Sequence, residues 1–260
     1  MNKNHPLIQL WQVLYPLLLY YAVVLIVLSF ARIVIGSDDA HYVICQLIAT
    51  VFAIPVMLPF YRVDRAMLGN PPLILGKKEI QAIAWAVLLA GLLSISCNNM
   101  ILMSPLVDFS EGFKEANAGF YGSTLWLELV SSALLTPVLE ELVFRGIVYG
   151  RIRRMIPVVP AVIVSALLFA LVHFNVVQFV YAFVMGIFLA VLVELCGHMY
   201  VAVAGHMMAN AIAVIRTETG FLSFTADSSV RAWSISFVLL GLFVLLMALF
   251  LYRERKHTNE

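Results

Sequence analysis

Long apolar runs, separated by short polar stretches, follow one another along the whole chain. A helix needs about 20 apolar residues to cross the hydrocarbon core of a bilayer, and eight segments come close to this length. They lie at about residues 10–31, 42–60, 80–104, 124–149, 156–174, 176–196, 198–215 and 232–252. We therefore expect an all-α fold, a polytopic membrane helix bundle of about eight transmembrane helices. Residues 1–260 should form a single integral membrane domain.

The composition supports a lipid environment and excludes other classes of protein. The chain is 63% hydrophobic and 12% charged, whereas soluble domains average roughly 25% charged residues. Its net charge of +1 argues against nucleic acid as a partner. The three cysteines are scattered through apolar stretches, which is not the pattern of a disulfide framework or of a Cys-x-x-Cys metal site.

The basic residues predict the orientation of the helices. An even number of spans places both termini on one side. If that side is the inside, inner segments hold 11 of the 16 Lys and Arg residues, namely Lys3, Arg62, Arg65, Lys77, Lys78, Arg151, Arg153, Arg154, Arg253, Arg255 and Lys256. Outer segments hold Arg32, Lys114, Arg216 and Arg231. By the positive-inside rule, we expect a multi-pass protein of the cell membrane with both termini in the cytoplasm.

Ionisable residues inside the apolar runs are the first candidates for chemistry, because each costs several kcal/mol in a bilayer. The fourth run contains Glu140, Glu141 and Arg145. Glu141 and Arg145 are four residues apart, so their side chains should meet on one helix face. Glu140 lies about 100° further round the helix and is free to face a cavity as a general base. A purely structural ion pair is the alternative.

Two further pairs of residues show the same four-residue spacing. Phe169 and His173 share a face of the fifth run, and His206 and Asn210 share a face of the seventh. His206 and Asn210 together offer hydrogen-bond donors of the kind that stabilise an oxyanion. The alternatives are an interfacial histidine for His173 and interhelical hydrogen bonding for His206 and Asn210.

These three motifs together resemble those of the CAAX protease and bacteriocin-processing family, the Abi or type II CAAX prenyl endopeptidase-like intramembrane proteases. The resemblance covers roughly residues 120–215, the expected catalytic core. It implies an endopeptidase that cuts a membrane-associated or lipid-modified peptide, including prenylated CAAX-type substrates. It also implies that Glu140 and His173 activate a water, that His206 and Asn210 stabilise the oxyanion, and that Glu141, Arg145 and Phe169 support the site.

Several alternatives stay open at this point. Glu140, His173 and His206 form a set that can bind zinc, but no His-Glu-x-x-His motif occurs, so we favour a metal-free glutamic mechanism without a cofactor. Buried ionisable residues also mark ion-coupled transporters. The resemblance further leaves open a non-catalytic bacteriocin-immunity protein, because some members of that family confer self-protection against bacteriocins. Straight, level helices would separate Glu140 from His173, which lie about 15 Å and 24 Å from the inner ends of their helices by a rise of about 1.5 Å per residue.

Overall fold

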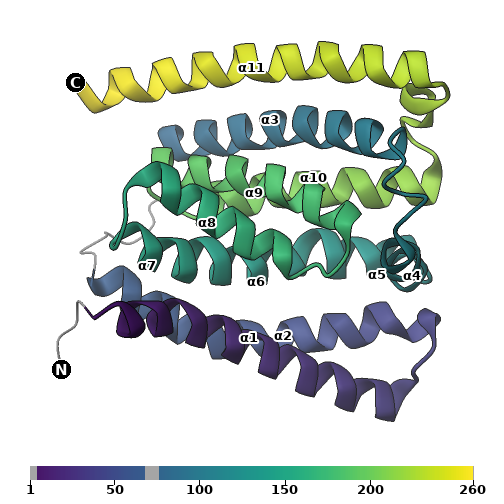
Figure 1. Ribbon diagram of the computed structural model, residues 1–260, viewed down its shortest axis with the longest axis horizontal. Coiled ribbons are helices and arrows are strands. Elements are labelled where there is room, and N and C mark those ends of the chain that lie inside the picture. The colour runs from purple at the N-terminus through teal and green to yellow at the C-terminus, as the bar shows by residue number, and fades with distance from the viewer. Residues whose placement is uncertain (1–4, 68–75, 260) are drawn as a thin grey trace.

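Helices account for all regular structure in the computed structural model, which describes residues 5–67 and 76–259. Within these ranges the helices form eight rods that run along the bundle (Figure 1). Seven of the rods are single helices: α1 Pro6–Ile35, α2 Asp39–Met67, α3 Lys77–Leu102, α8 Val158–Leu171, α9 Val176–Cys196, α10 Tyr200–Thr219 and α11 Ser229–Asn259.

The remaining rod, fourth along the chain, is assembled from five segments without a break. These are α5 Leu125–Glu128, η1 Leu129–Leu135, α6 Thr136–Glu141, η2 Leu142–Tyr149 and α7 Gly150–Arg153. The backbone at each junction keeps right-handed helical angles, so the rod is continuous. The segments η1 and η2 are π-helical, which the sequence did not predict.

The expected polytopic helix bundle is confirmed, with differences in individual rods. Five helices among the described residues are long and apolar enough to cross a membrane, namely α1, α2, α3, α9 and α11. The predicted fifth span, 156–174, contains an apolar helix of only 14 residues, α8. The predicted connection at 61–79 includes residues 68–75, which lie outside the described residues.

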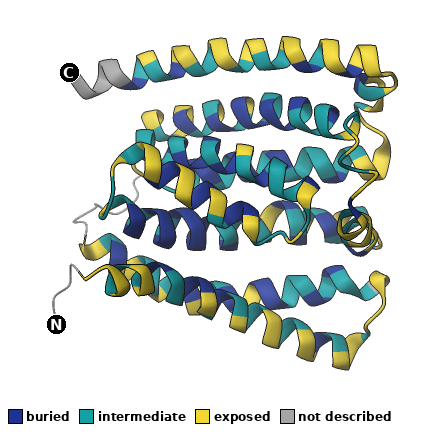
Figure 2. Ribbon diagram, in the orientation of Figure 1, coloured by how far each residue is buried: buried dark blue, intermediate teal, exposed yellow. Residues whose placement is uncertain are grey.

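The two chain ends lie at the same end of the bundle, which we call the terminus end (Figure 1). The α1–α2 pair forms one side of the bundle and α11 the other. Only 11% of the most apolar stretch is buried in α1 and in α11, against 44% in α9, so the two outer helices present apolar side chains outward (Figure 2). These faces suit contact with lipid.

The opposite end of the bundle carries a short helix that the sequence did not reveal. Residues 105–123 were predicted to be a loop, yet α4 (Glu111–Phe120) forms within them. It lies across the end of the rods and is seen end-on in Figure 1. The 3₁₀ turn η3 (Ser223–Ala226) is close to the same end. We call this the α4 end of the bundle.

Candidate active site

The two adjacent glutamates lie on α6, a short α-helical segment between the two π-helical segments. In η1 the backbone N–H of Thr136 donates to the carbonyl of Ser131, five residues back. Such π segments within α-helices are rare and frequently occur at functional sites. Their wider hydrogen-bond spacing changes which side chains face the neighbouring helices, and here it flanks Glu140 and Glu141 on both sides.

Glu141 and Arg145 form the ion pair that their spacing predicts. Arg145 Nη1 donates to Glu141 Oε1 over 2.9 Å, and neither side chain has exposed surface. The guanidinium also donates to the carbonyl of Gly186 on α9 over 3.2 Å. Its Cζ atom lies 4.3 Å from the ring centre of Phe169 on α8. This arginine therefore ties the fourth rod to α8 and α9.

His206 on α10 lies between the two glutamates. Its Nδ1 atom is 2.9 Å from Glu141 Oε1, the same oxygen that accepts from Arg145. Because a carboxylate oxygen accepts, Nδ1 carries a hydrogen in this contact. Its Nε2 atom lies 3.6 Å from Glu140 Oε2. Glu141 thus orients the imidazole so that Nε2 faces Glu140.

His173 presents one free ring nitrogen to the same region. Its Nδ1 atom is 2.9 Å from the backbone carbonyl of Phe169, and a carbonyl can only accept, so Nδ1 carries the hydrogen. In the neutral ring Nε2 is then an acceptor. The rings of Phe169 and His173 are 5.1 Å apart between centres, as expected for residues on one face.

The shortness of α8 removes the mismatch in depth between Glu140 and His173. The helix ends at Leu171, and the chain turns back through Phe174, which has a left-handed φ of 56°. Asn175 then caps α9 by accepting from the backbone N–H of Gln178 over 2.8 Å. The turn between α8 and α9 ends short of the ends of α3 and α10 (Figure 1), and His173 lines the cavity within the bundle.

Asn210 contacts the fourth rod where a backbone carbonyl of that rod lacks a hydrogen-bond donor within its own helix. The amide Nδ2 donates to the carbonyl of Ser132 over 2.8 Å. With π spacing that carbonyl would accept from residue 137, but Pro137 has no N–H. Asn210 satisfies this carbonyl with one amide hydrogen, and its second amide hydrogen remains available for a ligand.

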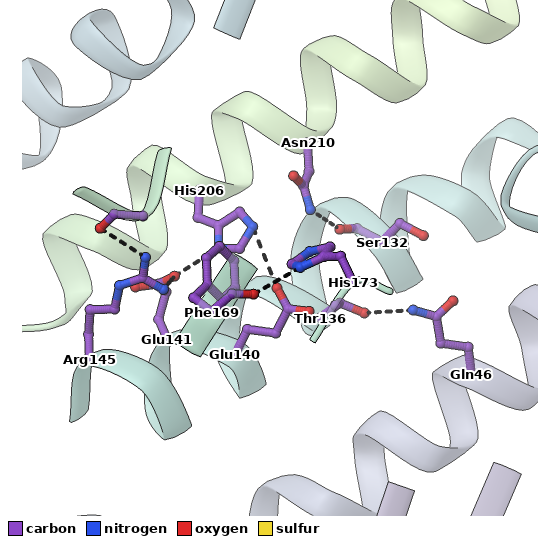
Figure 3. Close-up of polar contacts among 11 residues, drawn as sticks. Gln46, Ser132, Thr136, Glu140, Glu141, Arg145, Phe169, His173, His206 and Asn210 are labelled. Carbon is purple, nitrogen blue, oxygen red and sulfur yellow. Dashed lines mark hydrogen bonds and ion pairs between the residues drawn. The ribbon is translucent and has the colours of Figure 1, made fainter. Parts of the chain in front are cut away.

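A single cavity of about 530 Å³ joins these side chains. Glu140, His173, His206 and Asn210 all line it, and Figure 3 shows their polar heads directed toward one another. Gln46, Thr136 and Tyr181 also line it, and sequence reasoning missed them because a single glutamine, threonine or tyrosine in an apolar run carries no recognisable signal. Gln46 Oε1 is buried and has no hydrogen-bond partner.

The zinc alternative would use Glu140, His173 and His206 as ligands. These three residues line the cavity together, and carboxylate oxygens and imidazole nitrogens are common zinc ligands. Within the described ranges, however, no group of three or more His, Cys, Asp or Glu side chains lies close enough to hold a metal ion. The metal-free mechanism stays a prediction, and the mechanism proposed below has no step through a metal.

Other charged residues in the apolar runs have structural contacts. Glu128 accepts from the backbone N–H of Ser123 over 3.1 Å at the start of α5. Glu194 accepts from Arg153 over 3.1 Å and from the Tyr149 hydroxyl over 2.6 Å. None of these side chains lines the cavity.

The arginines near the terminus end pair with acidic residues of other rods. Arg151 is buried, and its Nε donates to Asp64 Oδ2 over 2.7 Å. Arg154 Nη2 reaches the other oxygen of Asp64 over 3.3 Å. Sequence reasoning did not identify Asp64 as a partner of these arginines, because Asp64 lies just beyond the predicted end of the second span.

The fold and the site define a class of protein: an integral membrane helix bundle with acid, base and amide groups around one internal cavity. Residues 122–212 match the family described as Type II CAAX prenyl endopeptidase Rce1-like, which confirms the resemblance drawn from the three motifs. This match indicates a CAAX protease-type hydrolase, and the family acts on membrane-associated substrates. No curated protein and no solved structure matches the chain significantly.

Proposed function

We propose that this protein hydrolyses a peptide bond of a lipid-modified or membrane-embedded peptide by a metal-free glutamic mechanism. The observation that supports it is the arrangement of four polar side chains from three rods around one cavity, with Glu140 and a free His173 Nε2 on its wall. Hydrolysis needs a water, a base for its proton and donors for the oxyanion. Glu140 can act as the base, and His206 and Asn210 can donate to the oxyanion of a substrate in the cavity.

The proposed reaction begins with a water held by Glu140 and His173. Glu140 takes one proton as the water oxygen attacks the carbonyl carbon of the substrate. The negative charge on the carbonyl oxygen is stabilised by the second amide hydrogen of Asn210 and by Nε2–H of His206. When the C–N bond breaks, the proton passes from Glu140 to the leaving nitrogen. The products are a carboxylic acid and an amine, so the water is fully accounted for.

Glu141 and Arg145 support this reaction through His206. Nδ1–H of His206 is committed to Glu141, so a donor at Nε2 requires the imidazolium form. Arg145 donates to the same Glu141 oxygen, so the two residues together fix the position of the imidazole. Both are positioning residues, since neither lines the cavity.

Replacing Glu140 by glutamine tests the role of the base. Membranes containing the Glu140→Gln variant should cleave a quenched fluorescent peptide with a farnesylated cysteine at least about 100-fold more slowly than the parent. Glu128→Gln is the matched control, because Glu128 is a buried glutamate on the same rod outside the cavity. Normal cleavage by a folded Glu140→Gln variant would remove Glu140 as the base.

Removal of metal ions separates the glutamic from the zinc mechanism. Treatment with 1,10-phenanthroline, followed by dialysis, should leave the cleavage rate of the parent protein unchanged. A loss of rate that zinc restores, and that calcium does not, would replace the proposed mechanism by a metal-dependent one.

We also propose that the protein lies in the cell membrane with both termini in the cytoplasm. The basic residues of the terminus end outnumber those of the α4 end by 11 to 4, counting Lys3 and the side chains of Arg255 and Lys256, which lie outside the described residues. The positive-inside rule assigns the more basic end to the cytoplasm.

A further inference from the structure

The cavity extends from the proposed site in one direction only. Beyond Asn210 its wall is formed by residues near the α4 end of the bundle: Ile101 and Leu102 of α3, Phe113 and Asn117 of α4, and Arg216 and Thr217 of α10. Thr217 is exposed. No residue of α7, of the first turns of α3 or of the last turns of α9 lines it.

Among the described residues, packed side chains separate the site from the terminus end, where a second pocket of about 440 Å³ shares no lining residue with this cavity. Phe144, Ile147 and Val148 on η2 have no exposed surface. Next to them Arg151 joins the fourth rod to α2 through Asp64, and Arg153 joins it to α9 through Glu194. A peptide that approached from the terminus end would have to disrupt this packing and these ion pairs.

The charge distribution assigns the open end to the outside of the cell. The α4 end carries only four basic residues and includes the acidic residues Asp38, Asp39, Asp108, Glu111, Glu115, Glu218 and Asp227. Acidic residues weigh little in the positive-inside rule, but the shortage of Lys and Arg weighs more. The cavity mouth therefore opens on the face opposite the cytoplasm.

From these observations we infer that substrates reach the site from the extracytoplasmic side. The substrate class is then an exported peptide, or the outer end of a membrane-anchored peptide, and not the tail of a protein that stays in the cytoplasm. This inference rests on the proposed function and narrows its substrate. The inference also argues against the processing of cytoplasmic CAAX tails, which is the role that the family description alone would suggest.

Cysteine labelling tests the side of access directly. In a variant with Cys45, Cys97 and Cys196 replaced by serine, Thr217→Cys reports on the mouth. Lys77→Cys, an exposed position at the start of α3, is the matched control at the terminus end. A membrane-impermeant maleimide should label Thr217→Cys, and not Lys77→Cys, in intact cells. Detergent-solubilised samples, in which both should react, confirm that each thiol is accessible.

Two outcomes of this labelling would overturn the inference. One is labelling of Lys77→Cys in intact cells, which would place the terminus end outside. The other is protection of Thr217→Cys in intact cells together with its labelling in inside-out vesicles. Either result would place the mouth in the cytoplasm.

Cleavage in oriented vesicles tests the substrate class. A quenched peptide library added to right-side-out vesicles should be hydrolysed at least 10-fold faster than the same library added to inside-out vesicles, and Glu140→Gln vesicles supply the background. Faster hydrolysis by inside-out vesicles would overturn the inference. If neither preparation exceeds the background, the proposed function fails, while the labelling result still decides which side the cavity faces.

Discussion

One oxygen atom, Glu141 Oε1, connects the buried ion pair to the proposed chemistry. It accepts from Arg145 Nη1 and lies at the same distance, 2.9 Å, from His206 Nδ1. Two donors on one fully buried oxygen fix the imidazole in position, while the other oxygen, Oε2, has no partner. The adjacent glutamates therefore have different tasks: Glu141 holds a histidine, and Glu140 faces the cavity.

Removing the arginine should destabilise the protein strongly. The Arg145→Met variant leaves Glu141 buried without its cation, and breaking a buried pair in this way costs about 3–5 kcal/mol. We expect a clear fall in the thermal unfolding midpoint in detergent, measured by tryptophan fluorescence. The double variant Glu141→Gln/Arg145→Met, which removes both charges, should recover part of the loss. An unchanged midpoint in the single variant would contradict the buried pair.

At the scale of the elements, the site depends on close contact between α8 and α9. A Cβ atom at Gly186 would lie 3.1 Å from both Cα and Cβ of Ala166 and 3.4 Å from Arg145 Nη2. Glycine thus lets α9 approach α8 while its carbonyl accepts from Arg145. The contact holds the short helix α8, and with it His173, at the depth of the cavity.

Adding one methyl group at this contact should therefore be costly. Gly186→Ala is expected to destabilise the protein by about 1–3 kcal/mol through overpacking and to lower the rate of peptide cleavage. Gly241→Ala on α11 is the control, because a Cβ atom there meets nothing within 4 Å. Equal unfolding midpoints for the two variants would show that α8 and α9 can separate without loss.

The sequence predicted the parts of this architecture that depend on local spacing. Apolar runs located all the rods, although α2 and α11 each extend seven residues beyond their predicted ends. Four-residue spacing brought Glu141 to Arg145 and Phe169 to His173. Neither π segment was predictable, because π spacing gains its stability from partners on other rods, such as the Asn210 amide on the Ser132 carbonyl. Contacts between distant rods carry no local pattern.

At the scale of the whole molecule, the bundle has two unlike ends. The terminus end is basic and packed with ion pairs, and the α4 end is poor in basic residues and contains the mouth of the cavity. The sequence alone predicted the difference in basic residues between the two ends. It missed α4, whose ten residues are too few and too polar to stand out among the long apolar runs.

Reporter fusions should reveal the orientation of the bundle. A fluorescent protein that folds only in the cytoplasm should fluoresce when attached after residue 260, and alkaline phosphatase, active only after export, should stay inactive there. Phosphatase inserted after Asp108, in the connection before α4, should be active. The reverse pattern of the two reporters would contradict the proposed orientation.

The packed half of the bundle below the site also bears on how a cell tolerates such a hydrolase. If the terminus end faces the cytoplasm, as proposed, polypeptides leaving the ribosome meet packed apolar side chains and ion pairs, with Glu140 and His173 on the far side of them. Compartment geometry would then protect newly made proteins from digestion, with no need for an inhibitory segment to be cut away first.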